Sequence, residues 1–214
     1  ASRRRPPGKG TMDDLITTFA LRCAALSNNG ARVVPEHETK ALLGARGVPV
    51  PKGLLCAGRD DAVGAAGSLG YPLVLKLASD AVLHKTEMGG VRTGICSEAD
   101  LLASFDEMHG RFVDQGVPGF LGILVEEQAG GGTEVIAGLQ NDPVFGPLLM
   151  LGLGGVLTDI FEDVSFRALP VTRDDIRAML NGLRGAALLR GYRGGPAVDT
   201  EALVKKASTL IEAL

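Results

Sequence analysis

One short segment of the chain carries the residue types of a phosphate-transfer loop. Residues 82–91 read VLHKTEMGGV, so His84 and Lys85 are adjacent and the pair Gly89 and Gly90 follows them. An imidazole is a competent nucleophile near pH 7, a lysine neutralises phosphate charge, and glycines let backbone N–H groups approach anionic oxygens. The alternative is a purely structural loop, because glycine pairs form turns and single histidines are usually ordinary surface or core groups.

Other segments contain further groups that suit a polyphosphate. Lys76 lies in the apolar stretch YPLVLKLAS, where its ammonium would need an anion if it faced a cleft. An equally good interpretation is a lysine that protects an edge strand. The sequence lacks a GxxxxGKS or GxxxxGKT phosphate loop, so any phosphate site is built differently. The remaining candidates are Glu126, Glu127, Glu134 and Arg167.

Alternating helices and strands are predicted to position these residues. The predicted strands lie in VPVPKGLLCAG, YPLVLKLAS, VRTGICS, ILVEE, TEVIAGLQND, PLLMLGLGG and DVSFRALPV. The predicted helices run from Pro35 to Gly47, Asp60 to Gly70, Ser97 to Gln115, over TRDDIRAMLNGLRG, and from Asp199 to Leu214. Asp60 is expected to cap its helix, and Ser97 with Asp100 and Thr172 with Asp175 have capping-box spacing. His37 and His109 are assigned to solvated helix faces.

Composition excludes several classes of protein. The 214 residues carry a formal net charge of −3 and 4% aromatic residues, which gives neither the basic field nor the stacking surfaces of a nucleic-acid binder. The three widely spaced cysteines favour a reducing compartment, and we expect a cytoplasmic location. No apolar run is long enough for a membrane span, so no membrane partner is expected. The segment ASRRRPPGKG has the composition of a linker.

Six stretches together carry a family resemblance: EHETKALLGARGVPVP, YPLVLKLAS, VLHKTEMGGVRTGI, ILVEEQAGGGTEVIAGLQNDPVFGP, LGLGGV and DVSFRALPV. In this order the chain resembles the ATP-grasp, or beta, portion of ADP-forming acetyl-CoA synthetases, relatives of succinyl-CoA synthetase, over nearly everything from Pro35 onward. The resemblance implies an α/β ATP-grasp fold with two α+β lobes that clamp a nucleotide. We expect a linker and helical lead-in at residues 1–34, a small lobe or lid at 35–125 and a large lobe at 126–214.

The resemblance also implies roles for the candidate residues. His84 would carry phosphate between the nucleotide and a partner subunit, while Lys85 would screen its charge and Gly89 and Gly90 would give the loop hinge freedom. Lys76 would contact nucleotide phosphate. The segment 126–128 (Glu126, Glu127 and Gln128) would face the adenine and ribose, Glu134 the sugar or phosphates, and Arg167 the phosphates.

The implied reaction is the reversible conversion of acid, CoA and ATP into acyl-CoA, ADP and phosphate. In the family pattern the Mg²⁺ ligands lie beyond Leu214, so this stretch is expected to be inactive in isolation. CoA would bind to an alpha subunit or fused domain that carries the CoA-ligase chemistry, in an oligomeric full enzyme. One alternative is a regulatory nucleotide-binding module fused to a protein lysine acetyltransferase. Another is a carboxylate–amine ligase that shares the ATP-grasp fold.

Overall fold

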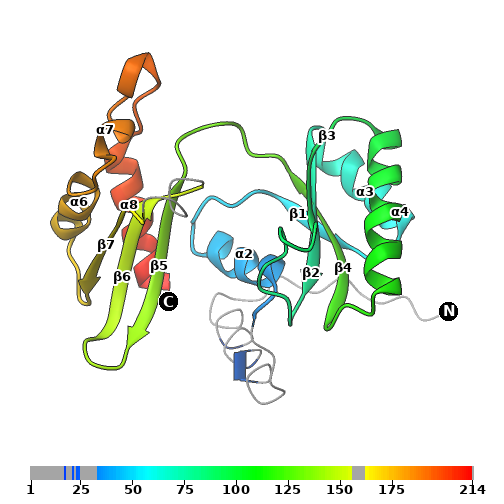
Figure 1. Cartoon of the computed structure of the whole chain (residues 1–214), viewed down its shortest axis with the longest axis horizontal. Coiled ribbons are helices and arrows are strands. Elements are labelled where there is room, and N and C mark those ends of the chain that lie inside the picture. Colours follow the sequence, from blue (N-terminus) through cyan, green and yellow to red (C-terminus); the bar gives the residue numbers. More distant parts are fainter. Residues whose placement is uncertain (1–16, 18–20, 22, 25–32, 156–161, 214) are drawn as a thin grey trace. The chain divides into compact units, whose positions relative to one another are not determined.

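The computed structural model describes residues 17, 21, 23–24, 33–155 and 162–213, so nearly all of the predicted lead-in lies outside the described residues. The chain divides into two compact units, Ala1–Ala129 and Gly130–Leu214, each with its own sheet (Figure 1). Glu126 and Glu127 complete a strand of the first unit, so the predicted lobe boundary at residues 125 and 126 falls inside that strand. The assignment of the units to lid and large lobe stays a prediction.

The first unit is built on a four-stranded antiparallel sheet. Its strands are β1 (Gly53–Cys56), β2 (Leu73–Ser79), β3 (Val91–Ile95) and β4 (Phe120–Glu127), in the order β1-β4-β2-β3. The helices are α2 (Glu36–Ala45), α3 (Arg59–Leu69) and α4 (Glu98–Asp114). Strand β2 bonds to β4 on one side and β3 on the other, so the edge-strand interpretation of Lys76 is wrong.

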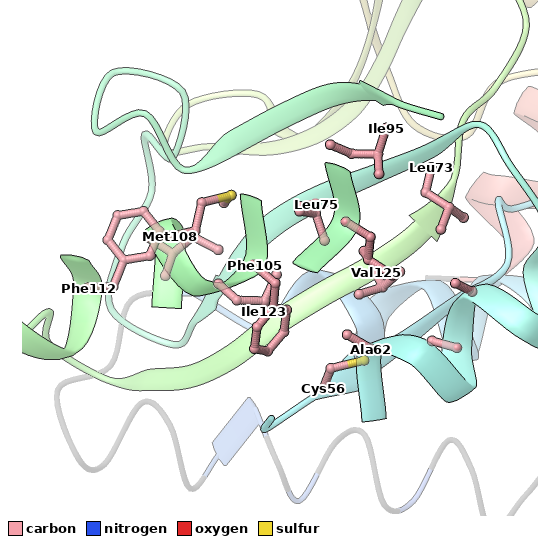
Figure 2. Packing of buried hydrophobic residues seen from close by; sticks show 14 of the residues in the cluster. Cys56, Ala62, Leu73, Leu75, Ile95, Phe105, Met108, Phe112, Ile123 and Val125 are labelled. Carbon is pink, nitrogen blue, oxygen red and sulfur yellow. The ribbon is translucent and has the colours of Figure 1, made fainter. Parts of the chain in front are cut away.

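The apolar core of the first unit lies on one face of this sheet. Leu73, Leu75 and Leu77 of β2 are fully buried against side chains of α3 and α4, which include Phe105 and Phe112 (Figure 2). Successive side chains of a strand point to opposite faces. Lys76 therefore lies on the face of the sheet opposite to this core.

The starts of two helices and the surroundings of one histidine can be compared with the sequence predictions. The Ser97 hydroxyl accepts a hydrogen bond from the Asp100 amide at 3.1 Å, as its spacing predicted. The predicted Asp60 cap is wrong, because α3 begins after Gly58 with no side-chain cap. His109 is also not on a solvated face: its ring stacks on Phe105 at 5.6 Å and contacts the edge of another aromatic ring. An imidazole is amphipathic enough to pack between rings.

His37 shows a milder departure from its prediction. Its side chain is half-buried on α2, and it lines a pocket of about 300 Å³ together with Lys40, Lys52 and Glu126. The prediction of a solvated face is wrong here too, because the side chain is half-buried in the wall of this pocket. Within the described residues, no helix combines the length and apolar character needed to cross a bilayer.

The second unit has a three-stranded antiparallel sheet of β5 (Val135–Asp142), β6 (Gly146–Leu153) and β7 (Val164–Ala168), in that order. Its helices are α6 (Arg173–Asn181), α7 (Ala186–Leu189), the 3-10 turn η1 (Tyr192–Gly194) and α8 (Thr200–Ala213). The Thr172/Asp175 capping box is present at the start of α6. The sequence analysis did not separate α7 from α6 and did not find η1. Leucines of β6 pack on α6 and α8 to form the second core.

Candidate functional site

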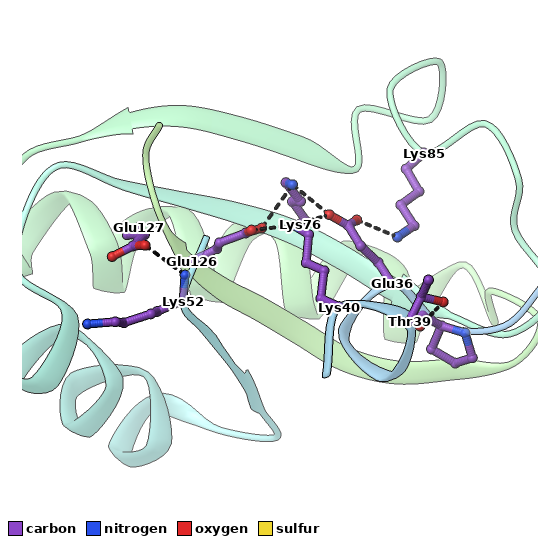
Figure 3. Close-up of polar contacts among 9 residues, drawn as sticks. Glu36, Thr39, Lys40, Lys52, Lys76, Lys85, Glu126 and Glu127 are labelled. Atoms are coloured by element: carbon purple, nitrogen blue, oxygen red, sulfur yellow. Dashed lines mark hydrogen bonds and ion pairs between the residues drawn. The ribbon is translucent and has the colours of Figure 1, made fainter. Parts of the chain in front are cut away.

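Five charged side chains of the first unit form one connected group, which we call the Lys–Glu cluster: Glu36, Lys40, Lys76, Lys85 and Glu126 (Figure 3). Oε1 of Glu36 accepts from Nζ of Lys40 and Nζ of Lys76, both at 2.7 Å. Oε2 of Glu36 accepts from Nζ of Lys85 at 3.1 Å. Glu126 pairs with Lys40, and its Oε2 lies 2.9 Å from Nζ of Lys76 as an ion pair.

The secondary structure explains how these groups meet. Glu36 and Lys40 are one turn apart on α2, where four-residue spacing places side chains on the same face. In the pairing of β2 with β4, Val74 lies opposite Glu126, so Lys76 is two residues away from it on the same face of the sheet. Lys85 belongs to the loop that follows β2.

Burial makes the charges of the Lys–Glu cluster interdependent. Burial by itself raises the pKa of Glu36, but hydrogen bonds from Lys40 and Lys76 outweigh it and lower this pKa to about 2. Burial likewise lowers the pKa of Lys76, but hydrogen bonds to Glu36 and Glu126 outweigh that effect and the pKa is raised. Three ammonium groups against two carboxylates leave the cluster with an excess positive charge, which favours an anionic ligand nearby.

His84 lies beside this cluster. An open pocket of about 420 Å³ is lined by Glu36, Lys76, His84, Lys85 and Glu87, among other residues. The His84 side chain is 76% exposed, and its Nδ1 lies 3.6 Å from a carboxylate oxygen of Glu87, which is too long for a hydrogen bond. The structure therefore brings together the predicted residues Lys76, His84 and Lys85.

Glu36 and Lys40 are the members of this site that the sequence analysis missed. Glu36 opens α2 directly after Pro35, and Lys40 follows at helical spacing, so their pairing with each other was visible in the sequence. Their contact with Lys76 was not, because 40 residues separate Glu36 from that lysine.

The glycine pair closes the loop in a tight turn. The Gly90 amide donates to the Lys85 carbonyl at 2.7 Å, and a guanidinium nitrogen of Arg111 donates to the Gly89 carbonyl at 2.6 Å. A Cβ at Gly90 would lie 2.8 Å from the Lys85 carbonyl oxygen and 2.9 Å from Cβ of Leu77, and Gly89 has a φ of +64°. Glycine is required here by close approach and backbone conformation. The predicted hinge freedom stays a prediction.

The residues of the predicted hinge make separate contacts within the first unit. Glu126 is 1% exposed and belongs to the Lys–Glu cluster. A carboxylate oxygen of Glu127 accepts from the Lys52 amide at 2.8 Å, and the side-chain oxygen of Gln128 accepts from the Gly94 amide at 2.7 Å. These bonds fix the end of β4, and the nucleotide contacts predicted for this segment stay predictions.

The two other predicted residues belong to the second unit. Arg167 on β7 pairs with Asp175, the carboxylate of the α6 capping box. Glu134 lines a pocket of about 370 Å³ together with Thr133, Gly154, Tyr192 and others, and its carbonyl accepts from the Gly154 amide at 2.8 Å. These contacts lie within the second unit, and the roles of Arg167 and Glu134 toward a nucleotide stay predictions.

Metal-ligating side chains do not gather in the described part of the chain. Within the part of the chain that the structure describes, no group of three or more His, Cys, Asp or Glu side chains could hold a metal ion.

Comparison with known proteins defines the class of the fold. Residues 25–213 match the family described as ATP-grasp domain. The beta subunit of ADP-forming acetate–CoA ligase II of Pyrococcus furiosus is 35% identical over 189 residues, which are 86% of this chain and 80% of that subunit. The ADP-forming acetate–CoA ligase II of Archaeoglobus fulgidus is 38% identical over 158 residues, which are 74% of this chain but only 23% of that longer protein.

Solved structures agree with this family. An acetyl-coenzyme A synthetase of Ca. Korarchaeum cryptofilum, in complex with coenzyme A and Ca-AMPCP, matches with a TM-score of 0.80 and 36% identity over 95% of this chain and 85% of that chain. In another structure of that enzyme, with Mg-AMPPCP, a phosphohistidine segment points towards the nucleotide binding site (TM-score 0.70, 34% identity, 95% and 84% coverage). The chain belongs to the ATP-grasp family, in the group that includes the beta portions of ADP-forming acetate–CoA ligases.

Proposed function

We propose that this chain is the nucleotide-binding part of an ADP-forming acyl-CoA ligase that acts through a phosphohistidine at His84. The observation that carries the proposal is the pocket in which an exposed imidazole lies beside Lys76, Lys85 and the excess positive charge of the Lys–Glu cluster. Membership of a family whose relatives are acetate–CoA ligases supports the same chemistry.

In the proposed first step, a nitrogen of the His84 imidazole attacks the terminal phosphorus of ATP. A P–N bond forms while the P–O bond to ADP breaks, and ADP leaves with the bonding electrons. In a neutral imidazole one ring nitrogen carries the proton and the other keeps the lone pair that makes the attack. Lys76 and Lys85 would bind the phosphate oxygens and orient them.

In the later steps the phosphoryl group passes from His84 to the carboxylate of the acid. A P–O bond forms as the P–N bond breaks, and the acyl phosphate then reacts with the CoA thiol, which loses its proton as phosphate leaves. We assign this thioester chemistry to a CoA-binding alpha subunit or fused domain, because relatives of this chain are named as beta subunits or as longer single-chain ligases. The chain alone is therefore expected to bind nucleotide without forming acyl-CoA.

The proposal extends to ATP or ADP with Mg²⁺ as ligands, because a relative has been solved with Mg-AMPPCP. Glu126, Glu127, Gln128, Glu134 and Arg167 are kept as proposed nucleotide contacts. The relatives named above are CoA ligases or synthetases, and they give no support to a module fused to a lysine acetyltransferase. Among the described residues, no contact favours a carboxylate–amine ligase.

The test uses labelled ATP and the enzyme assembled with its CoA-binding portion. Wild-type protein should acquire an acid-labile, base-stable phosphate, and His84→Ala should abolish labelling and acyl-CoA formation while changing nucleotide affinity by no more than about twofold. Lys85→Ala should slow the labelling of His84 without abolishing it. Lys76→Ala should weaken nucleotide binding at least about tenfold, the loss expected of a charged hydrogen bond. Acyl-CoA formation at the wild-type rate in His84→Ala would refute the proposal.

A further inference from the structure

We propose that Glu36 is a positioning residue that holds the His84 loop, residues 82–91, through its ion pair with Lys85, and that a phosphoryl group on His84 releases the loop by taking Lys85 from Glu36. The inference deepens the proposed function and rests on it for the identity of the phosphorylated residue. It goes further because it assigns a role to a side chain on α2 that lies outside the loop itself.

The two carboxylate oxygens of Glu36 have different partners. Oε1 accepts from Lys40 on its own helix and from Lys76 on β2, both at 2.7 Å, while Oε2 accepts from Lys85 of the loop at 3.1 Å (Figure 3). One side chain thus connects the loop to both a helix and the centre of the sheet. The Lys85 side chain is 15% exposed, so its ammonium is largely withdrawn from water and depends on this carboxylate.

Lys85 is also the residue at which the loop turn is closed. Its carbonyl accepts from the Gly90 amide at 2.7 Å, and its side chain reaches the Lys–Glu cluster. His84 is its direct neighbour in the chain and lines the same pocket as Glu36. Loss of the Glu36–Lys85 ion pair should therefore loosen the turn next to the imidazole.

A phosphoryl group on His84 can compete for Lys85 without leaving a buried charge unpaired. Its oxygens carry negative charge into the pocket that Glu36 already occupies, so the two anions repel each other and both attract Lys85. If Lys85 moves to the phosphoryl group, Glu36 keeps Lys40 and Lys76. Because the pKa of Glu36 is lowered to about 2, its carboxylate stays charged near neutral pH. The change of ion-pair partner by Lys85 therefore responds to the phosphoryl group and not to protonation of Glu36.

The other end of the loop is fixed independently. The Arg111 guanidinium holds the Gly89 carbonyl at 2.6 Å, and the Gly90 carbonyl accepts from the Leu77 amide of β2 at 2.7 Å. Release of Lys85 should therefore expose the Gly90 amide, whose acceptor is Lys85, and leave the Leu77 amide protected. The Gly90 amide is therefore the probe of loop release, and the Leu77 amide, which bonds to the same glycine, is the reference.

The first experiment measures hydrogen exchange of these amides by NMR on the 214-residue chain without nucleotide. Lys85→Gln, which leaves the other contacts of Glu36 in place, should raise Gly90 exchange by about tenfold and leave Leu77 unchanged. Glu36→Gln should raise Gly90 exchange similarly, and the double variant should match Lys85→Gln. Asp106→Asn, which removes an exposed pair with Arg59, is the matched control and should change neither amide.

Unchanged Gly90 exchange in Lys85→Gln would overturn the positioning role. So would a double variant whose exchange is the product of the two single effects, because Glu36 would then act by a route other than Lys85.

The second experiment adds the phosphoryl group chemically. Phosphoramidate transfers its phosphoryl group to an exposed imidazole with loss of ammonia, so no nucleotide chemistry is needed, and His84→Ala controls for reaction elsewhere. Phosphorylated wild type should show the fast Gly90 exchange of Lys85→Gln, and phosphorylation of Lys85→Gln should add nothing. Full protection of the Gly90 amide in the phosphorylated chain would refute the competition between the phosphoryl group and Glu36 for Lys85. If fast Gly90 exchange appears but ATP never labels His84, the role of the Glu36–Lys85 ion pair is supported and the proposed function fails.

Discussion

Two networks of ion pairs, one in each unit, have similar distances but differ in solvent exposure, and this difference decides how much each network contributes. In the second unit, the Arg177 guanidinium binds both carboxylate oxygens of Glu201 at 2.8 and 2.9 Å and also pairs with Asp174. In the first unit the Lys–Glu cluster has comparable distances, but the Glu126 side chain is 2% exposed, against 69% for Glu201. Water can replace the partners of the exposed network and cannot easily replace those of the buried one.

The balance of charge differs as well. Arg177 faces two carboxylates, so its network offers no excess positive charge to an anion. The Lys–Glu cluster has an ammonium in excess and borders a pocket that contains an imidazole. The Arg177 network joins α6 to α8. The Lys–Glu cluster has the charge and the position to take part in phosphate chemistry.

The largest expected effect comes from removing one partner of the buried network. Glu126→Ala should lower the free energy of unfolding of the first unit by about 3–5 kcal/mol, because Lys40 and Lys76 lose a carboxylate that water cannot replace. Urea denaturation followed by NMR signals of β2 and β4 measures this loss. Asp106→Asn, the exposed control, should stay within about 0.5 kcal/mol of wild type. A Glu126→Ala protein as stable as that control would show that the cluster is solvated in solution.

A smaller effect should appear on acidification. The pKa of Glu36 is lowered from 4.5 to about 2, so its ionised form contributes stability that is complete above about pH 4.5 and is lost as the pH falls toward 2. The shift sets an upper bound of about 3 kcal/mol, which solvent screening of a partly exposed carboxylate reduces to about 1–2 kcal/mol. The difference in unfolding free energy between wild type and Glu36→Gln should shrink by that amount across this interval. A difference independent of pH would contradict the assignment.

The smallest effect should come from the exposed network. Arg177→Gln removes the pairs with Glu201 and Asp174 but leaves each carboxylate in contact with water. We expect a smaller loss of stability than in Glu126→Ala, and one that vanishes in about 1 M salt, where charges are screened within a few ångströms. Thermal unfolding at low and high salt measures both. A salt-independent loss as large as that of Glu126→Ala would remove the distinction between the two networks.

Much of the local structure was predictable because it depends on neighbouring residues. The apolar run around Lys76, the capping spacing of Ser97 and Thr172, and the glycine pair after His84 each predicted an element or turn that the structure contains. The order and spacing of the six matching stretches also predicted the ATP-grasp family, which the comparisons confirm. The Asp60 cap failed because the N-cap of α3 is Gly58, two residues earlier, so Asp60 lies inside the helix.

Tertiary structure alone decided which charges meet when they are far apart in the sequence. Lys40 lies 86 residues from Glu126, and Lys85 lies 49 residues from Glu36, so no local pattern could pair them. His109 shows the same limit, because its solvated prediction failed when folding brought β4 and its Phe120 ring against α4. Periodicity fixes the direction of a side chain within its own element, whereas its partner, and hence its charge state and its accessibility to ligand, depend on which elements the core packs together.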